Sequence, residues 1–408
     1  MKFENKICFL IGWSRELDMF KYLIQKLKKK EIIFIINDLN KVKKNHKLEQ
    51  LNIRRILNKK NYKTKFLSQV LNKNKYKILI STGDLPVSSV NLKSILKFLY
   101  SKTFGAVIEI LKLNFFLKEM FGREFTAGGL SSSIYDNKFI EKKISHKSFK
   151  FPNGLDRNLK NFPDKRWINI FDFYFAASKI EKNLILDKFT KKKVFFIGYT
   201  RFDKEKNSKT ELLRYFRINK NKKTILCCPN ERILNLQNEK SFKRYLLFFE
   251  KLNDNYNVIL RPHPKLKFTN LKLFKMITNS NLIIDLEPDR NIKNLFSISD
   301  LIVTDYGNSV LEAIYLNKKT IIFKWPNDQN FQIMFEKKDC LDFMVQKKMK
   351  KIDLFKGENS QKFNKNLIDR IIRSTSYKRS IKAINTKYFK QNKNVINPIK
   401  IIKNEYNS

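Results

Sequence analysis

Three polar segments of the 408-residue chain hold side chains that could bind or transfer phosphate groups. In the first, residues 257–265 (NVILRPHPK), an apolar run ends in Arg261 and is followed by His263 between two prolines. A guanidinium can fork onto phosphate oxygens, and the prolines restrict the loop that holds the imidazole. Because the chain has only 3 histidines, we expect this one to act on phosphate. The alternative is a structural hydrogen-bonding role.

The second segment, residues 297–323, predicts a buried strand, a polar loop and a helix, in that order. Amides at a helix N-terminus suit a phosphate, and open α/β sheets bind ligands at the carboxyl ends of their strands. Thr304, Asn308 and Ser309 could add side-chain donors, and Glu312, one turn later, could accept from ribose hydroxyls. The alternative is an ordinary helix cap and turn.

The third segment, residues 144–154 (ISHKSFKFPNG), is expected to lie on a loop. His146 could titrate near neutral pH and act as a general base, and Lys150 could offset phosphate charge. On local sequence alone, a plain surface histidine is the favoured interpretation. His46, in a lysine-rich polar run, is expected to be solvated.

Short runs of Ile, Val and Phe alternate with polar segments long enough for helices, which predicts an α/β protein with parallel strands. One helix is expected over residues 17–29, and the polar segment 200–209 is the predicted linker. The predicted domains are 1–204, 205–375 and a basic C-terminal helix with a partly mobile tail, 376–408. Strands are expected at 6–11, 32–36, 78–80, 106–110, 171–176, 194–197, 224–228, 257–260, 282–285, 301–303 and 320–323.

The composition narrows the class of protein. The 85 basic and 38 acidic residues leave a formal charge of +47, which would suit nucleic acid or an anionic membrane. Only 16 of the basic residues are Arg, and Lys, Asn, Ile and Phe, which are abundant here, are encoded by A/T-rich codons. We therefore attribute much of the positive charge to codon composition and do not take it as evidence of a nucleic-acid partner. The 4 cysteines form no CxxC pair, and no apolar run reaches the 18 residues that span a bilayer. We expect a cytosolic chain without a disulfide framework, metal site or signal peptide.

Taken in order, these segments resemble the CDP-glycerol glycerophosphotransferase family, whose enzymes build teichoic-acid-like envelope polymers. The resemblance covers about residues 140–325, and its last two motifs are the most specific. The chain departs from the family pattern at Lys147, Thr200, Gly307 and Asn308, where the family has Gly, Pro and paired Ser. The motifs are SHKSFK (145–150), FDFYFAASKIEKNLILDKF (171–189), FFIGYTRFD (195–203), TILCCPNE (224–231), NVILRPHPK (257–265) and SDLIVTDYGNSVLEA (299–313).

The resemblance implies a GT-B-like fold, in which two Rossmann-like domains with parallel sheets face each other across a cleft. The N-terminal domain would take the acceptor, the C-terminal domain would bind the nucleotide donor, and catalysis would need neither metal nor cofactor. His146 and His263 would be catalytic, the first as the base toward the acceptor. The residues that would bind the nucleotide or its phosphates are Lys150, Arg201, Asn230, Arg261, Thr304, Asp305, Asn308, Ser309 and Glu312.

The expected function is transfer of a glycerophosphate or other polyol phosphate from a CDP-activated donor to a hydroxyl of a cell-envelope polysaccharide. The alternative within the class is a glycosyltransferase that uses a nucleotide sugar in capsule or lipopolysaccharide synthesis. Outside the class are a basic nucleic-acid-binding protein, for which no recognisable module is seen, and an inactive partner of an envelope complex, which should have lost its histidines.

The expected partners are a CDP- or UDP-linked donor and a lipid-linked saccharide acceptor, with no nucleic acid. The basic residues of 376–408 would hold a cytoplasmic protein peripherally at the anionic inner face of the cell membrane.

Overall fold

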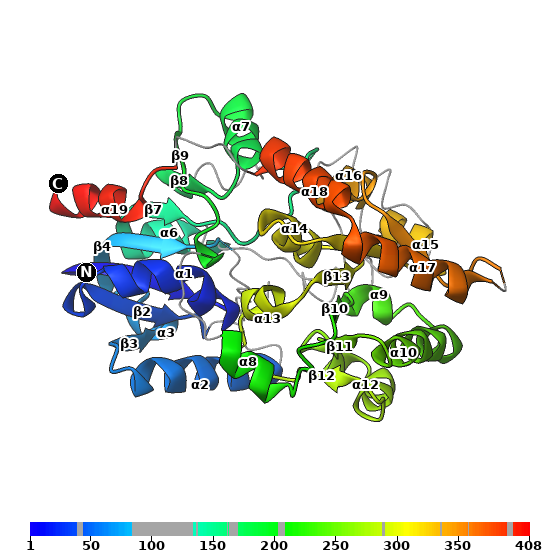
Figure 1. Cartoon of the computed structure of the whole chain (residues 1–408). Helices are drawn as coiled ribbons and strands as arrows, with labels where there is room; N and C mark the ends of the chain where they lie inside the picture. Colours follow the sequence, from blue (N-terminus) through cyan, green and yellow to red (C-terminus); the bar gives the residue numbers. More distant parts are fainter. Residues whose placement is uncertain are drawn as a thin grey trace, which may run out of the picture.

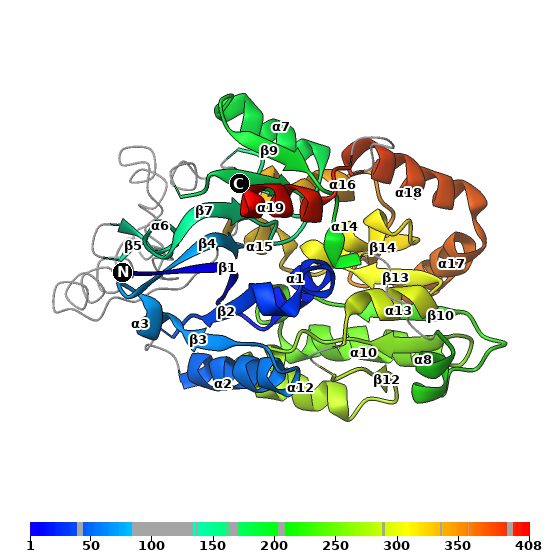
Figure 2. The same ribbon diagram turned by 90° about the vertical axis from the view of Figure 1, so that its left-hand side faces the viewer.

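The computed structural model describes residues 1–38, 44–83, 134–135, 138–160, 162, 170–202, 209–287, 290–334, 337–357, 359–389 and 395–408. Within these ranges the chain forms two parallel sheets with helices packed against them (Figure 1, Figure 2). The predicted α/β fold with two sheets is therefore confirmed. The strand expected at residues 106–110 lies outside the described residues.

The first sheet has the strand order β3-β2-β1-β4-β7-β8-β9, and its neighbouring strands run parallel. Its β-branched and aromatic runs bury both faces, as in β2 (IIFII), where all five residues are buried. The strands are β1 (Lys2–Ile11), β2 (Ile32–Ile36), β3 (Thr64–Phe66), β4 (Asn74–Ser81), β7 (Ser145–Lys150), β8 (Phe173–Ala176) and β9 (Lys193–Phe196). The intervening helices are α1 (Arg15–Lys26), η1 (Lys29–Glu31), α2 (Lys44–Lys59), α3 (Leu67–Val70), α6 (Ile140–Ile144) and α7 (Lys179–Lys188). A separate antiparallel pair joins β5 (Ile134–Tyr135) to β6 (Lys138–Phe139).

The second sheet has the order β12-β11-β10-β13-β14-β15, again with parallel neighbours. Its strands are β10 (Thr224–Cys228), β11 (Asn257–Leu260), β12 (Ile283–Ile284), β13 (Leu301–Thr304), β14 (Thr320–Lys324) and β15 (Lys351–Asp353). The helices from η3 onward are η3 (Thr200–Phe202), α8 (Lys209–Tyr215), α9 (Glu231–Leu234), α10 (Glu239–Asn253), α11 (Leu266–Thr269), α12 (Leu271–Thr278), α13 (Ile292–Ile298) and α14 (Asn308–Tyr315). They continue with α15 (Asp328–Met334), η4 (Lys337–Asp339), α16 (Leu341–Gln346), α17 (Ser360–Arg373), α18 (Thr375–Tyr388) and α19 (Pro398–Asn407).

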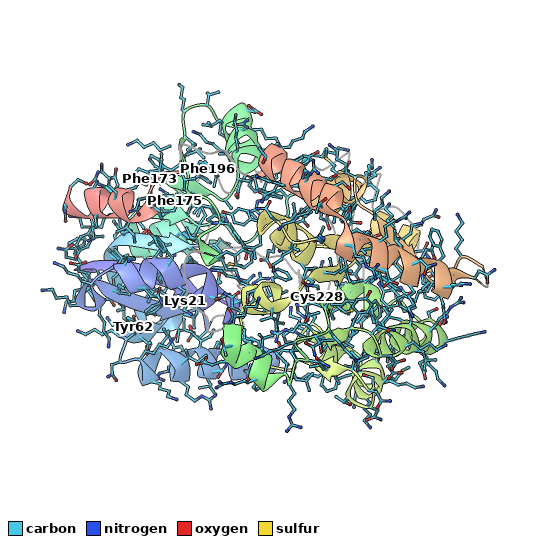
Figure 3. All side chains as sticks on the ribbon, viewed as in Figure 1. Lys21, Tyr62, Phe173, Phe175, Phe196 and Cys228 are labelled. Carbon is cyan, nitrogen blue, oxygen red and sulfur yellow. The ribbon has the colours of Figure 1, made fainter. Side chains whose placement is uncertain are left out.

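Each sheet has its own apolar core. In the first domain, Phe173 and Phe175 of β8 and Phe196 of β9 are buried, and Figure 3 shows their side chains together on that sheet. The Phe149 and Phe173 rings stack with centroids 4.5 Å apart. In the second domain a separate buried cluster surrounds β10, whose Cys228 is also marked in Figure 3. The chain passes from one sheet to the other between β9 and β10, and the larger cluster of the second sheet also takes in Leu155, Ala177, Tyr199 and Phe202 from before β10.

The C-terminal segment, expected as a basic helix with a partly mobile tail, forms the helices α18 and α19. Helix α18 buries Tyr377, Ile381 and Ile384 against the second domain. The chain then returns to the first domain, where Ile399 and Ile402 of α19 join the core (Figure 1). The α19 surface is fixed as well, because Glu405 accepts from Lys147 Nζ at 2.8 Å. In the described part of the predicted segment, residues 376–389 and 395–408, the apolar faces of these helices are thus part of both cores. Within the described ranges, no helix is long and apolar enough to cross a bilayer.

Candidate functional site at the interface of the two domains

The carboxyl ends of both sheets lie against each other. Lys265, which follows β11 in the second domain, places its Nζ 5.4 Å from the centre of the Trp13 ring, which follows β1 in the first. Nearby, Asn291 Nδ2 donates to Asp18 Oδ1 of α1 at 3.0 Å. Ligands of open α/β sheets bind at such carboxyl ends. This interface is therefore the candidate site.

His263 lies in this interface, on the loop between β11 and α11. Desolvation lowers the pKa of His263 to about 4, even though part of the ring stays exposed. The carboxylate of Glu231 opposes this decrease in pKa, whereas the cations Lys265, Arg15 and Arg232 add to it. The imidazole is therefore neutral at pH 7. Its Nδ1 accepts from the Lys265 backbone N–H at 3.2 Å, so the proton lies on Nε2. His263 thus presents an N–H donor among three cations.

We call His263, Arg15, Arg232 and Lys265 the His263 cluster. Arg15 begins α1 in the first domain, whereas Arg232 lies on α9 and Lys265 precedes α11 in the second. Guanidinium, ammonium and imidazole N–H groups are the donors that proteins use for phosphate oxygens. The two domains have to meet for the cluster to form.

The start of α14 is built from three residues that the sequence analysis selected. Thr304 is buried, and its Oγ1 donates to Cys228 O at 2.9 Å and lies 2.7 Å from Ser309 Oγ. Asn308 Oδ1 accepts from the backbone N–H groups of Leu155 and Asp156, at 2.9 and 3.0 Å. The structure therefore brings these residues together at the interface, with Asn308 in contact with the first domain.

Asp305 and Asn230 hold neighbouring loops of the second domain together. Asp305 is fully buried and accepts from the backbone N–H groups of Asn230 (2.9 and 3.1 Å) and Tyr306 (2.7 Å) and from Trp325 Nε1 (2.9 Å). Burial raises the pKa of Asp305 to about 7, against the N–H donors that favour its ionised form. Asn230 caps α9 by accepting from Arg232 N–H at 2.9 Å. Asp305 therefore supports these loops, and the nucleotide contact expected for it stays a prediction.

Arg261 also differs from its expected role. Its Nη1 pairs with the fully buried Asp285 and donates to Glu287 O at 2.5 Å, and its Nη2 donates to Arg290 O at 3.2 Å. Arg290 Nε contacts the same Asp285 at 3.0 Å. The guanidinium therefore fixes the loop after β12, and its expected contact with a pyrophosphate stays a prediction.

Glu312 and Arg201 pair with each other. Glu312 is 2% exposed, and its Oε1 accepts from Arg201 Nη1 and from Tyr199 Oη, both at 2.7 Å. The other side of the Arg201 guanidinium contacts Asp18 Oδ2 at 2.7 Å. A carboxylate this enclosed is not a surface acceptor for ribose. The two residues are thus engaged with each other, and the direct nucleotide contacts expected for them stay predictions.

His146 and Lys150 lie at opposite ends of β7. His146 is exposed near the amino end, where its ring meets Phe3 edge to face at 5.1 Å, and burial and then Lys75 lower its pKa. Lys150 ends the strand and donates to Thr82 O and, at 3.2 Å, to Phe151 O. Four residues of strand separate the two by about 13 Å. The structure corrects the expectation that His146 faces the cleft, because it lies at the opposite edge of the sheet.

Four interface residues were missed by sequence reasoning. Trp13 and Arg15 follow the first strand at the start of a helix, a pattern that could have marked them, and Arg232 follows the CCPNE run. Asp342 of α16 gave no local signal. It is buried, and its Oδ2 accepts from Gly307 N–H at 2.6 Å beside the start of α14. Its carboxylate oxygen also lies within 4.8 Å of ligand atoms of Asp156 and Cys340.

The chain resembles known proteins in both sequence and fold. A teichoic acid glycerol-phosphate transferase of Staphylococcus aureus (strain NCTC 8325 / PS 47) is 24% identical over 190 residues, which are 43% of this chain and 47% of that protein. The match thus spans about half the length of this curated relative.

The fold matches the wall teichoic acid polymerase TagF with a TM-score of 0.56 at 14% identity, over 99% of this chain and 88% of that one. A TagF variant soaked with CDPG matches with a TM-score of 0.55 at 15% identity, over 99% and 88% of the two chains. At this identity the likeness establishes the fold alone. The model of the family described as CDP-Glycerol:Poly(glycerophosphate) glycerophosphotransferase matches residues 154–395, more than half of the chain. The chain belongs to this family.

Proposed function

We propose that the protein transfers glycerophosphate, or another polyol phosphate, from a CDP-activated donor to a hydroxyl of a cell-envelope polymer. The observation that carries this proposal is the His263 cluster, where a neutral imidazole donor lies among Arg15, Arg232 and Lys265 at the carboxyl edges of the sheets. A diphosphate offers the negative charge and the oxygens that such a cluster binds. Family membership supplies the chemical class.

The proposed reaction is an in-line displacement at phosphorus. The acceptor hydroxyl oxygen forms a bond to the phosphorus of the glycerophosphate group and loses its proton to water. The bond between that phosphorus and the bridging oxygen breaks, and CMP leaves with the bonding pair. His263 Nε2–H donates to a phosphate oxygen as its charge grows, while the cations of the cluster offset the total charge.

The N-termini of α1 and α14 add to this environment. Backbone amides at a helix start carry partial positive charge and bind phosphate oxygens. Ser309, whose hydroxyl is supported by the buried Thr304 Oγ1 at 2.7 Å, would hold the nucleotide side of the donor at α14. Asn230 contributes by holding Arg232 at the start of α9.

A direct assay tests the proposal. Purified protein is incubated with CDP-glycerol, or with another CDP-linked polyol, and with a saccharide acceptor, and CMP release and acceptor mass are measured. We expect CMP to form in step with a mass gain of one glycerophosphate on the acceptor. In parallel reactions with UDP- or CDP-linked sugars, release of UDP or CDP with transfer of the sugar, and no CMP from the polyol donors, would contradict the proposal and support a glycosyltransferase.

The proposal also includes a lipid-linked acceptor and a peripheral location of the protein at a membrane. The outer sides of α17 and α18 carry exposed cations and, in the first turn of α17, Phe363 with 65% of its surface exposed. We call this surface the α17–α18 face; in Figure 1 the two helices follow each other along the outside of the second domain. Its exposed basic residues are Lys362, Lys365, Arg370, Arg373, Lys378, Arg379, Lys382 and Lys387.

Charge complementarity supports a peripheral contact with an anionic leaflet. Each Lys or Arg close to such a surface contributes about 1 kcal/mol. The α17–α18 face takes the place of the mobile tail, because the apolar sides of α18 and α19 are packed in the cores. The protein would thus work on the cytoplasmic side, where a lipid-linked acceptor is extended.

A further inference from the structure

Arg201 joins two helices that begin at the candidate site and belong to different domains. Its Nε contacts Asp18 Oδ2 in the first turn of α1 at 2.7 Å. Its Nη1 contacts Glu312 Oε1 of α14, also at 2.7 Å. Since α1 begins at Arg15 and α14 at Asn308, one guanidinium fixes the distance between these two helix starts.

Other contacts brace the same junction. Asn291, which caps α13, donates to the second oxygen of Asp18 at 3.0 Å. Tyr199 donates to Glu312 at 2.7 Å, and Lys293 Nζ donates to Phe202 O at 2.6 Å. Every one of these bonds links the region of α1 and η3 to α13 or α14.

The side chains of this junction are so little exposed that separating their charges would be costly. The side chains of Arg201, Asp18 and Glu312 are 20%, 26% and 3% exposed. Desolvation opposes the charge on Arg201, but the carboxylates of Glu312 and Asp18 hold its pKa above the usual value. Removing one partner of such an enclosed pair leaves an uncompensated charge. The contact therefore favours the single arrangement in which both acids meet the guanidinium.

We propose that Arg201 is a positioning residue that completes the donor site by holding α1 against α14. The His263 cluster takes Arg15 from α1 and its other members from the second domain. When α1 moves away, Arg15 is lost from the cluster, although Arg201 itself touches no donor. The nucleotide part of this inference rests on the proposed function.

The first test measures CDP affinity by calorimetry in a mutant cycle. Asp18→Asn and Glu312→Gln should each weaken CDP binding on the order of 10-fold, the size of a typical coupling between sites. In an Arg201→Gln background, neither should weaken it further, because the two acids act through the guanidinium. A further loss from Glu312→Gln in that background would show that Glu312 binds the nucleotide directly and would overturn the proposal.

A second test needs no nucleotide, so its result remains informative about Arg201 even if the proposed function is wrong. The native cysteines are all buried, so spin labels can be placed selectively at Lys26→Cys on α1 and Lys275→Cys on α12, both of which are exposed. Arg201→Gln should broaden the distribution of distances between the labels. Arg201→Lys, which can reach one acid but not both, should broaden it less.

Glu4→Gln is the matched control. Glu4 pairs with Lys65 at 2.8 Å inside the first domain, at the amino edge of its sheet. This variant should leave both CDP affinity and the distance distribution unchanged. If Arg201→Gln left the distances as narrow as the control does, the positioning role would be wrong.

Discussion

The side-chain amide of Asn308 lies where a methyl group on Gly154 would be. A Cβ added to Gly154 would approach Asn308 Oδ1 to 2.7 Å and Nδ2 to 2.8 Å. Gly154 has a φ of +151° and follows β7 in the first domain, whereas Asn308 begins α14 in the second. The two domains meet so closely here that only a residue without a side chain fits.

Gly154→Ala should therefore weaken the contact between the domains. Strain at a positive φ costs about 1 kcal/mol or more, and the clash with Asn308 adds to it. Thermal unfolding and CDP binding should both be impaired. Gly357→Ala is the control, because Gly357 also has a positive φ of +83° but nothing within 4 Å of an added Cβ.

A double variant separates the clash from the strain. Asn308→Gly should restore part of the CDP affinity lost in Gly154→Ala, because it removes the amide that the new methyl group meets. No restoration, together with equal effects of Gly154→Ala and Gly357→Ala on stability, would leave backbone strain as the whole explanation.

Substitution of His263 and of His146 should change turnover to very different extents. His263→Ala should lower turnover on the order of 100-fold, the effect of losing one positioned donor to a developing charge. His146→Ala should leave turnover near the wild-type value, because His146 lies at the amino edge of the first sheet beside Phe3. Steady-state CMP release checks both, and circular dichroism shows whether each variant is folded. A large loss in His146→Ala would contradict the placement of the site.

The lowered pKa of His263 predicts how stability depends on pH. Desolvation, opposed by Glu231 and reinforced by Lys265, Arg15 and Arg232, lowers it from 6.5 to about 4. As the pH falls below 6.5, the unfolded chain takes up a proton there, while the folded protein does so only near pH 4. Stability from this group is therefore present above pH 6.5 and is lost toward pH 4.

Urea unfolding across this pH window checks the prediction. His263→Gln should show a shallower fall in the free energy of unfolding between pH 6.5 and 4 than the wild type. Identical slopes would mean that His263 has the same pKa in the folded and the unfolded protein and would contradict the prediction.

Arg261 should matter for stability. Arg261→Ala leaves the buried Asp285 with Arg290 as its remaining basic partner, and breaking a buried ion pair costs about 3 to 5 kcal/mol. We expect a loss near the lower end, measured by urea unfolding. Arg232→Ala should give the reverse pattern, with near-normal stability and weaker CDP binding. Equal stability of Arg261→Ala and wild type would support the role expected from the sequence.

The sequence predicted the features that local pattern determines. Apolar runs such as residues 32–36 and 301–303 became buried strands, and the loop with His263 lies at the end of one of them. The contact partners of long polar side chains could not be predicted from the sequence, because Arg261 contacts Asp285 and Glu312 contacts Arg201 only after the chain has folded. A local motif shows that a charge is present but not whether a protein group neutralises it.

The error at His146 has a similar cause. Which end of β7 faces the interface depends on its parallel pairing with β4, in which Tyr76 is opposite Ser145 and Ser81 is opposite Lys150. The motif alone does not contain that register. The return of α19 to the first domain is equally invisible, since its apolar residues match a core formed almost 400 residues earlier, around Ile7 and Phe9.

The α17–α18 face should bind anionic membranes through its clustered charge, and the high net charge of +47 makes a charge-matched control essential. Replacing Lys365, Arg373, Lys378 and Arg379 with Gln should weaken binding to vesicles containing phosphatidylglycerol on the order of 1,000-fold, because each of the four charges contributes about 1 kcal/mol near the surface. Replacing the exposed Lys26, Lys28, Lys59 and Lys60 of the first domain removes the same charge elsewhere and should have a much smaller effect.

Co-sedimentation with vesicles at low and high salt measures the binding of both variants, since added salt screens such attraction. Equal weakening in the two variants would show that diffuse charge, and not this face, attracts the protein to the membrane.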